Sequence, residues 1–302
     1  MELYQNKEAL IDAIQATSNS LKIVPSLIEK DYFVTLILRR LNQTIPGLLF
    51  KGGTCCSKAY KVINRFSEDI DLSLDINHFS RANARLANKA VISVCDELGF
   101  RIINREKVEK HSHGSYNCYY VEYPIIYPSV GIKPYVQIEM VFMSKSYPSE
   151  TKTVNSFIGD LVFSRNKEIA EKYNLLPFAI IVQSLDRTFV DKVFAVCDYY
   201  LKNEAFRNSR HIYDLFQIGK QIELNESLLP LIQDVRGMRI KNKHCPSAKD
   251  GNSVSQNLID IVSSHYFEKD YNEVTYNLLI TKVDYDTIIS ILLNVAQSKL
   301  FN

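Results

Sequence analysis

The sequence predicts an α+β protein, with a mixed α/β domain at residues 1–165 followed by an all-helical domain at residues 166–302. Two observations carry this prediction. In the first half, short apolar runs and alternating apolar and polar residues, typical of strands, occur between helical segments. After about residue 165, the apolar residues recur at the helical spacings of three and four. At 302 residues, 46% of them hydrophobic, the chain is long enough for two domains with separate cores.

The first half begins with an amphipathic pattern at residues 27–41, which Pro46-Gly47 ends. The predicted elements that follow are a strand at 48–50, a helix at 54–64, a strand at 66–74, a helix at 80–98 closed by Gly99, and strands at 116–126 and 133–143. Because side chains alternate along a strand, Tyr135, Gln137 and Glu139 share one face of the last one. Val136, Ile138, Met140 and Phe142 share the other, apolar face.

The second half reads as a series of helices. Their predicted ranges are 185–201, 210–219, 226–236, 254–268, 271–282 and 286–298. On the first of them an apolar stripe leaves Lys192 on a neighbouring face, where an exposed lysine is the ordinary interpretation.

Composition indicates an ordinary soluble protein. No apolar stretch approaches the roughly 20 residues of a membrane helix, and the N-terminus lacks the pattern of a secretion signal, so we expect a cytoplasmic protein. The six cysteines form no CxxC pair and are expected to be reduced, mostly buried thiols.

The net charge of +2 is too small to indicate a nucleic-acid binder by itself. A local basic patch contains Arg236, Arg239, Lys241 and Lys243. Such a patch is more often a solvated face than a binding surface.

A glycine pair stands between a predicted strand and a predicted helix, in Lys51-Gly52-Gly53-Thr54. Glycine is scarce in this chain, with 10 in 302 residues, and it permits a close approach of the backbone to a ligand. The helix N-terminus that follows offers unpaired N–H groups to an anion. The pair therefore suggests a phosphate site, although a glycine pair alone is more often a simple turn, and no GxxxxGK[ST] loop is present.

Three carboxylates are candidates for a metal site. Asp69 and Asp71 project from one face of the predicted strand at 66–74, and Glu139 stands on another strand between apolar neighbours. Three carboxylates on adjacent strands suit Mg²⁺, which prefers oxygen ligands and substrate phosphates, and such sites catalyse nucleotide transfer from an NTP. Asp-x-Asp alone is also common on solvated strand edges. Lys192 is a candidate for neutralising the triphosphate.

These residues resemble the AbiEii family of nucleotidyltransferase-like toxins, which are related to the MenT toxins of bacterial type IV toxin–antitoxin systems. The resemblance covers about residues 27 to 249. Its motifs are Glu29-Lys30-Asp31-Tyr32-Phe33-Val34-Thr35, Lys51-Gly52-Gly53-Thr54 with Ser57-Lys58-Ala59-Tyr60, Arg65-Phe66-Ser67-Glu68-Asp69-Ile70-Asp71-Leu72, Glu139, and Arg187-Thr188-Phe189 through Tyr213-Asp214-Leu215.

The resemblance implies a DNA-polymerase-β-like nucleotidyltransferase domain with a helical domain after it. It implies that Gly52, Gly53 and Thr54 hold the phosphates and that Asp69 and Asp71 bind metal. It also implies that Lys192 and Asp214 form a later motif. In that motif Asp214 would fix Lys192, or contact metal or nucleotide. Glu139 is matched by its position and its apolar neighbours. On their chemistry, Lys58, Arg65 and Arg210 are expected to contact phosphate or RNA.

The function expected from these residues is Mg²⁺-dependent transfer of a nucleoside monophosphate from an NTP to RNA. The resemblance suggests the tRNA 3′ end as the acceptor, which would block translation, and a cognate antitoxin as a partner. Two alternatives stay open. In the first, the acceptor is a hydroxyl of a protein or a small molecule. In the second, the fold is degenerate, and it binds an NTP or a partner without catalysis.

Overall fold

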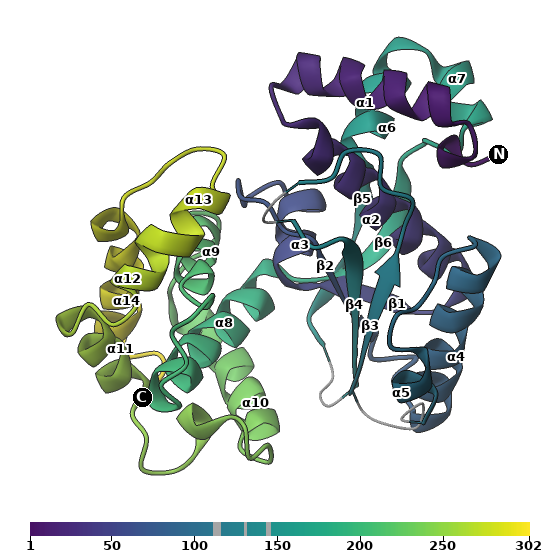
Figure 1. The fold of residues 1–302 in the computed structure, drawn as a ribbon. Helices are drawn as coiled ribbons and strands as arrows, with labels where there is room; N and C mark the ends of the chain where they lie inside the picture. The colour runs from purple at the N-terminus through teal and green to yellow at the C-terminus, as the bar shows by residue number, and fades with distance from the viewer. Residues whose placement is uncertain (111–115, 130–131, 143–145) are drawn as a thin grey trace. The chain divides into compact units, whose positions relative to one another are not determined.

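The computed structural model describes residues 1–110, 116–129, 132–142 and 146–302, which form two compact units (Figure 1). The first unit comprises Met1–Tyr60 and Ser67–Val182, and the second comprises Lys61–Phe66 and Gln183–Asn302. The division thus falls after Val182 and not after residue 165, because the apolar segment that precedes it is a strand of the sheet. Lys61–Phe66 belongs to the second unit because its backbone bonds to residues 278–280.

The first unit contains a mixed sheet, so the predicted α+β class is confirmed. Within the described residues the sheet has six strands in the order β3-β4-β2-β1-β6-β5. The strands are β1 (Leu48–Lys51), β2 (Asp69–Leu74), β3 (Tyr116–Glu122), β4 (Tyr135–Val141), β5 (Ser149–Val154) and β6 (Phe178–Gln183). β1 runs antiparallel to β2 and parallel to β6, while β4 runs parallel to β2 and antiparallel to β3. The two parallel pairs, β2 with β4 and β1 with β6, therefore join strands that are distant in sequence.

Burial alternates along β4 as the sequence predicts. Val136, Ile138 and Met140 are fully buried, whereas Gln137 and Glu139 on the opposite face are partly exposed. The strand is shorter than the predicted 133–143, and Met143 lies outside the described residues. One face of the sheet thus belongs to the core, and the other carries polar side chains.

Seven α-helices are described in the first unit: α1 (Lys7–Leu21), α2 (Pro25–Thr44), α3 (Gly52–Lys58), α4 (Arg81–Glu97), α5 (Arg105–Lys110), α6 (Phe157–Arg165) and α7 (Lys167–Lys172). Figure 1 shows α1, α6 and α7 grouped together, and α2 contacts both β2 and β4. α4 begins where Ser80 caps the amide of Asn83, and it ends before Gly99 at φ 71°. α3 ends six residues before the predicted end of the helix, so 59–64 is not helical.

Three consecutive charged residues of α2 are buried and hold the unit together. The Glu29 carboxylate accepts hydrogen bonds from two backbone amides that follow β3. The Lys30 ammonium donates to the backbone carbonyls of Lys133 and Tyr135 at the start of β4. Asp31 accepts a hydrogen bond from the first amide of α6 and pairs with a lysine of α3. Buried charges need such partners, and here each partner lies on a different segment.

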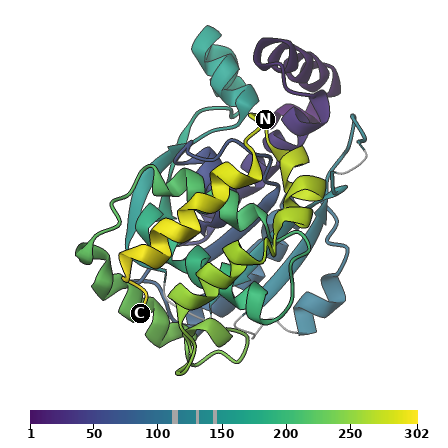
Figure 2. The same cartoon turned by 90° about the vertical axis from the view of Figure 1, so that its left-hand side faces the viewer.

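The second unit is helical, as predicted. Its described helices are α8 (Leu185–Leu201), α9 (Arg210–Gly219), α10 (Leu229–Arg239), α11 (Val254–Ser263), α12 (Glu268–Asp270), α13 (Tyr276–Leu278) and α14 (Tyr285–Ser298). α14, yellow in Figure 2, packs against α9 and α11. The predicted helix at 254–268 ends at Ser263, because His265 adopts φ 51°. The predicted helix at 271–282 begins with a π-helical turn at Tyr271–Thr275 and ends at Leu278, because Leu279 is extended.

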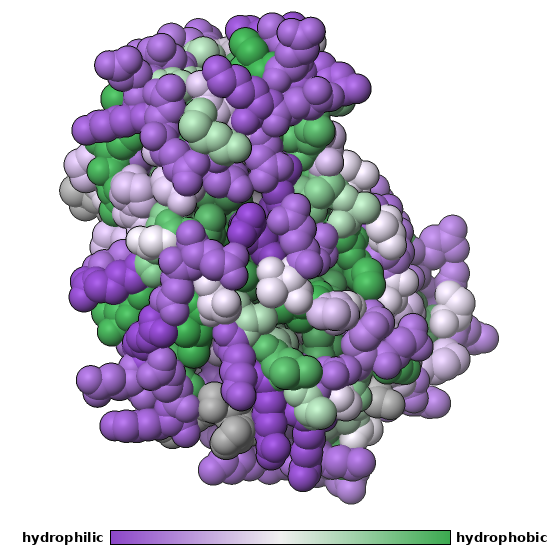
Figure 3. Space-filling model, turned by 90° about the vertical axis from the view of Figure 1, so that its right-hand side faces the viewer, coloured by the Kyte–Doolittle hydropathy of each residue, from purple (hydrophilic) through white to green (hydrophobic). Residues whose placement is uncertain are grey.

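Hydrophilic side chains cover much of the face of the molecule that Figure 3 shows, with smaller hydrophobic groups among them. Among the described helices, none combines the length and the apolar composition needed to cross a membrane. All six cysteines are free of disulfides, and four of them are buried.

Candidate active site

Asp69, Asp71 and Glu139 lie on one face of two adjacent strands. In the parallel pairing of β2 and β4, Asp71 stands opposite Glu139 and Asp69 opposite Gln137. The residues between them, such as Ile70 and Ile138, are fully buried on the other face. The pairing therefore places the three predicted metal ligands on the same face of neighbouring strands.

These carboxylates already have polar partners. The ammonium nitrogen of Lys133 lies 3.1 Å from Oδ1 of Asp69 and 2.9 Å from Oε1 of Gln137, whose amide donates to Glu139 over 2.6 Å. Among the described residues, no three His, Cys, Asp or Glu side chains converge as a preformed metal cluster. The three carboxylates nevertheless offer only oxygen atoms as metal ligands, and one of them already binds a cationic ammonium. This chemistry fits a hard divalent cation.

Lys133 was not predicted as a site residue. The sequence does contain a pattern that places Lys133 near the site. Lys133, Tyr135, Gln137 and Glu139 are spaced by two residues, so in an extended segment their side chains share one face.

Gly52 is required where it stands. It adopts φ +77°, a conformation that L side chains rarely adopt, and a Cβ built on it would lie 1.9 Å from Oδ2 of Asp71. The Asp71 carboxylate thus lies directly against the backbone of the glycine pair. Gly53 follows as the second residue of α3.

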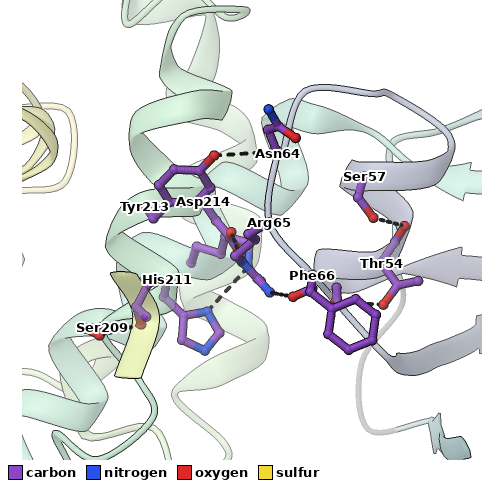
Figure 4. Close-up of polar contacts among 12 residues, drawn as sticks. Thr54, Ser57, Asn64, Arg65, Phe66, Ser209, His211, Tyr213 and Asp214 are labelled. Carbon is purple, nitrogen blue, oxygen red and sulfur yellow. Dashed lines mark hydrogen bonds and ion pairs between the residues drawn. The ribbon is translucent and has the colours of Figure 1, made fainter. Parts of the chain in front are cut away.

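Thr54 and Lys58, two predicted nucleotide contacts, are engaged inside the first unit. The Thr54 hydroxyl, which is buried, donates to the carbonyl of Asp69 and bonds to the Ser67 hydroxyl over 2.8 Å. Its own carbonyl accepts a hydrogen bond from Ser57 (Figure 4). Lys58 pairs with Asp31, and both side chains are 8% exposed. These contacts fix α3 against β2 and α2, so both residues position the glycine pair and the aspartates.

A second polar cluster lies in the helical unit around Asp214 (Figure 4). Arg65 donates to both carboxylate oxygens of Asp214, over 2.7 and 2.8 Å, and the Lys192 ammonium lies 2.7 Å from Oδ2. All three side chains are buried. Lys192 is therefore buried, and not the exposed lysine that a helical surface position ordinarily carries. Arg65, a predicted phosphate contact, is held by a carboxylate that lies 149 residues later in the chain.

The cluster carries a net positive charge. Nδ1 of His211 lies 3.3 Å from the Lys192 ammonium, which can only donate, so Nδ1 is the acceptor. Burial, reinforced by Lys192, lowers the pKa of His211 well below its usual value, so the imidazole is neutral. Burial alone would raise the pKa of Asp214, but the charges of Arg65 and Lys192 hold it far below its usual value. Two cations thus share one buried anion.

Replacing Asp214 with Asn is expected to destabilise the helical unit by about 3–5 kcal/mol, because two buried cations lose their counter-charge. Since the folded pKa of Asp214 is depressed, its contribution is present at neutral pH and is lost as the pH falls below the ordinary value of 3.8. Denaturant unfolding at pH 7 and at pH 3 measures both effects, with the exposed Asp250→Asn as the control. A loss below 1 kcal/mol at pH 7 would contradict the assignment.

The predicted RNA-binding residues divide into two groups. Arg236 donates to the carbonyl of Phe301, and Arg239 pairs with Asp198, so both arginines hold the helical unit together. Lys241 and Lys243 are exposed. Arg210 is partly buried at the start of α9, and its Nε has no hydrogen-bond partner within the described part of the chain.

Comparison with known proteins gives two matches. Residues 36–287 match the family model described as nucleotidyl transferase AbiEii toxin, type IV TA system. Among solved structures, the chain is similar to MenT4, a nucleotidyltransferase toxin from Mycobacterium tuberculosis H37Rv, with a TM-score of 0.57 and 15% identity over 94% of this chain and 88% of that chain. At this identity the structural likeness concerns the fold alone. No curated protein matches the chain.

Proposed function

Because the chain belongs to the AbiEii family of nucleotidyltransferase toxins of type IV toxin–antitoxin systems, we propose that it transfers a nucleoside monophosphate from an NTP to the 3′ end of tRNA. The transfer would block translation in the cytoplasm, and a cognate antitoxin would counteract it. The observation that carries the proposal is the placement of Asp69, Asp71 and Glu139 on one face of paired strands, beside Gly52.

The first unit would supply the transfer chemistry. Asp69, Asp71 and Glu139 would hold Mg²⁺, which activates an attacking hydroxyl and stabilises a leaving pyrophosphate. The acceptor oxygen forms a bond to the α-phosphorus of the NTP, and the bond from that phosphorus to the β-phosphate oxygen breaks. Glu139 would help to orient or deprotonate the acceptor hydroxyl. The backbone of Gly52 and Gly53 approaches the phosphates closely, as only glycine permits.

The helical unit would supply positive charge. Lys192 neutralises the triphosphate, and Asp214 holds the ammonium in place. Arg210, which is partly exposed at the start of α9, would contact phosphate or RNA. Lys58 and Arg65, which form ion pairs with Asp31 and Asp214, would position the residues around them.

Incubation of the purified protein with each labelled NTP, Mg²⁺ and tRNA tests the proposal. We expect label on the tRNA 3′ end, and none with Asp71→Asn. Label on a protein band or a small molecule in place of RNA would support the alternative acceptors. If the unmodified protein labels no RNA with any NTP, the tRNA acceptor is excluded.

The acceptor is expected to contact Lys241 and Lys243, since phosphate neutralisation dominates affinity for RNA. The double variant Lys241→Ala/Lys243→Ala should bind tRNA more weakly and reduce the slope of log K against log salt by roughly 0.7 per lost contact. Binding titrations at several salt concentrations measure this, with the exposed Lys269→Ala as the control. An unchanged slope would show that the two lysines are merely solvated.

A further inference from the structure

We propose that Lys133 is the resident counter-cation of the carboxylate site, which a divalent ion displaces from Asp69 and which then binds phosphate oxygens of the nucleotide. This inference rests on the proposed function of the same face of the sheet and adds a residue to it.

Lys133 is linked to two of the three carboxylates. Its ammonium bonds directly to Asp69, and it reaches Glu139 through Gln137, which accepts from Lys133 and donates to Glu139. Asp69, Asp71 and Glu139 place three negative charges on this face, so a cation is needed there in the absence of metal. Lys133 meets that need with a single charge.

The backbone of Lys133 is held while its side chain is free to change partner. Its amide donates to Glu68 over 3.2 Å, and its carbonyl accepts from the fully buried Lys30 over 2.8 Å. Lys30 and Glu68 are themselves 3.4 Å apart. Because these contacts use only backbone groups of Lys133, its flexible four-carbon side chain can turn without disturbing β4.

The Lys133–Asp69 pair is more exposed than the Lys58–Asp31 pair of the same unit. The Lys133 and Asp69 side chains are 23% and 15% exposed, whereas both partners of the Lys58–Asp31 pair are 8% exposed. An ammonium at the edge of solvent is displaced more easily than a buried one, since water compensates its lost contacts. A divalent cation brings twice the charge to the same oxygens, and a nearby triphosphate offers the displaced ammonium a new anion.

Binding of Mn²⁺ to the full chain without nucleotide tests the displacement, with the free-ion signal followed by electron paramagnetic resonance. Lys133→Met should bind Mn²⁺ about fivefold more tightly than the unmodified protein, because the competing cation is gone. Lys133→Arg, which keeps the charge, should not gain affinity, and Lys89→Met, an exposed lysine of the same unit, should change nothing. With Mn²⁺ present, Lys133→Met should bind a non-hydrolysable NTP analogue about fivefold more weakly.

Equal Mn²⁺ affinity for Lys133→Met and the unmodified protein, together with loss of binding in Asp69→Asn, would overturn the inference and leave the proposed function intact. A gain of affinity in Lys133→Arg as large as in Lys133→Met would also overturn it, because local rearrangement would then be the cause. Absence of Mn²⁺ binding to every form, with and without the analogue, would remove the metal site itself. Label transfer to tRNA reports separately on the proposed function.

Discussion

Asp69→Asn and Asp71→Asn are each expected to reduce nucleotidyl transfer by about a thousandfold while the protein stays folded. The substitution keeps the size of the side chain and removes the negative charge that would hold the metal and, through it, the triphosphate. Neither aspartate is fully buried, and the Asp69 side chain is 15% exposed. Loss of one carboxylate from a face that holds three should relieve repulsion, so thermal unfolding should change little.

Initial rates with labelled NTP and tRNA, and growth after induction, give the two readouts. Asp160→Asn, an exposed aspartate on α6 of the same unit, is the matched control and should retain full activity. If either active-site variant kept more than about a tenth of the rate, the face of β2 and β4 would not be the transfer site. Undiminished toxicity in both variants would favour the degenerate, binding-only alternative.

Gly52→Ala is the second substitution with a large expected effect. A methyl group at Gly52 would occupy the position of the Asp71 carboxylate, since its Cβ would lie 1.9 Å from Oδ2. The carboxylate must move by more than an ångström to restore ordinary contact, and a displacement of that size costs about 100-fold in rate. The φ of +77° adds a backbone cost of about 1–2 kcal/mol to the free energy of folding.

Gly99→Ala separates the two effects. Gly99 has a similar φ of +71°, and a Cβ built on it meets nothing within 4 Å. Both variants should therefore lose similar stability in denaturant unfolding, but only Gly52→Ala should lose transfer activity. Equal activity in the two variants would mean that the position of Asp71 does not matter for the reaction.

The helices at 185–201 and 210–219 were predicted to the residue, because their signals are local. Ser184 caps the amide of Arg187, and the apolar stripe of α8 has helical spacing. β6 was missed, since the run Phe178–Gln183 is almost continuously apolar, as in strands buried on both faces, and has no period of its own. β5, at the edge of the sheet, is mostly polar and exposed, so it carries little apolar signal.

The candidate site likewise combines features that local sequence patterns predict with features that they do not. The period of two placed Asp69 and Asp71 on one face, but the adjacency of Glu139 depends on the pairing of β2 with β4, which no local pattern specifies. The partners of Lys58 and Arg65 lie 27 and 149 residues away in sequence. Long-range ion pairs therefore decide which basic residues are structural and which are free to meet a substrate.

Sequencing the 3′ ends of cellular RNA after induction tests the central claim most directly, because it reads the acceptor and the added nucleotide together. Induction of the unmodified protein should add nucleotides to tRNA 3′ ends before growth stops, and induction of Asp71→Asn should leave those ends unchanged. If growth stops while every RNA 3′ end stays as it was, the protein is not an RNA nucleotidyltransferase in the cell.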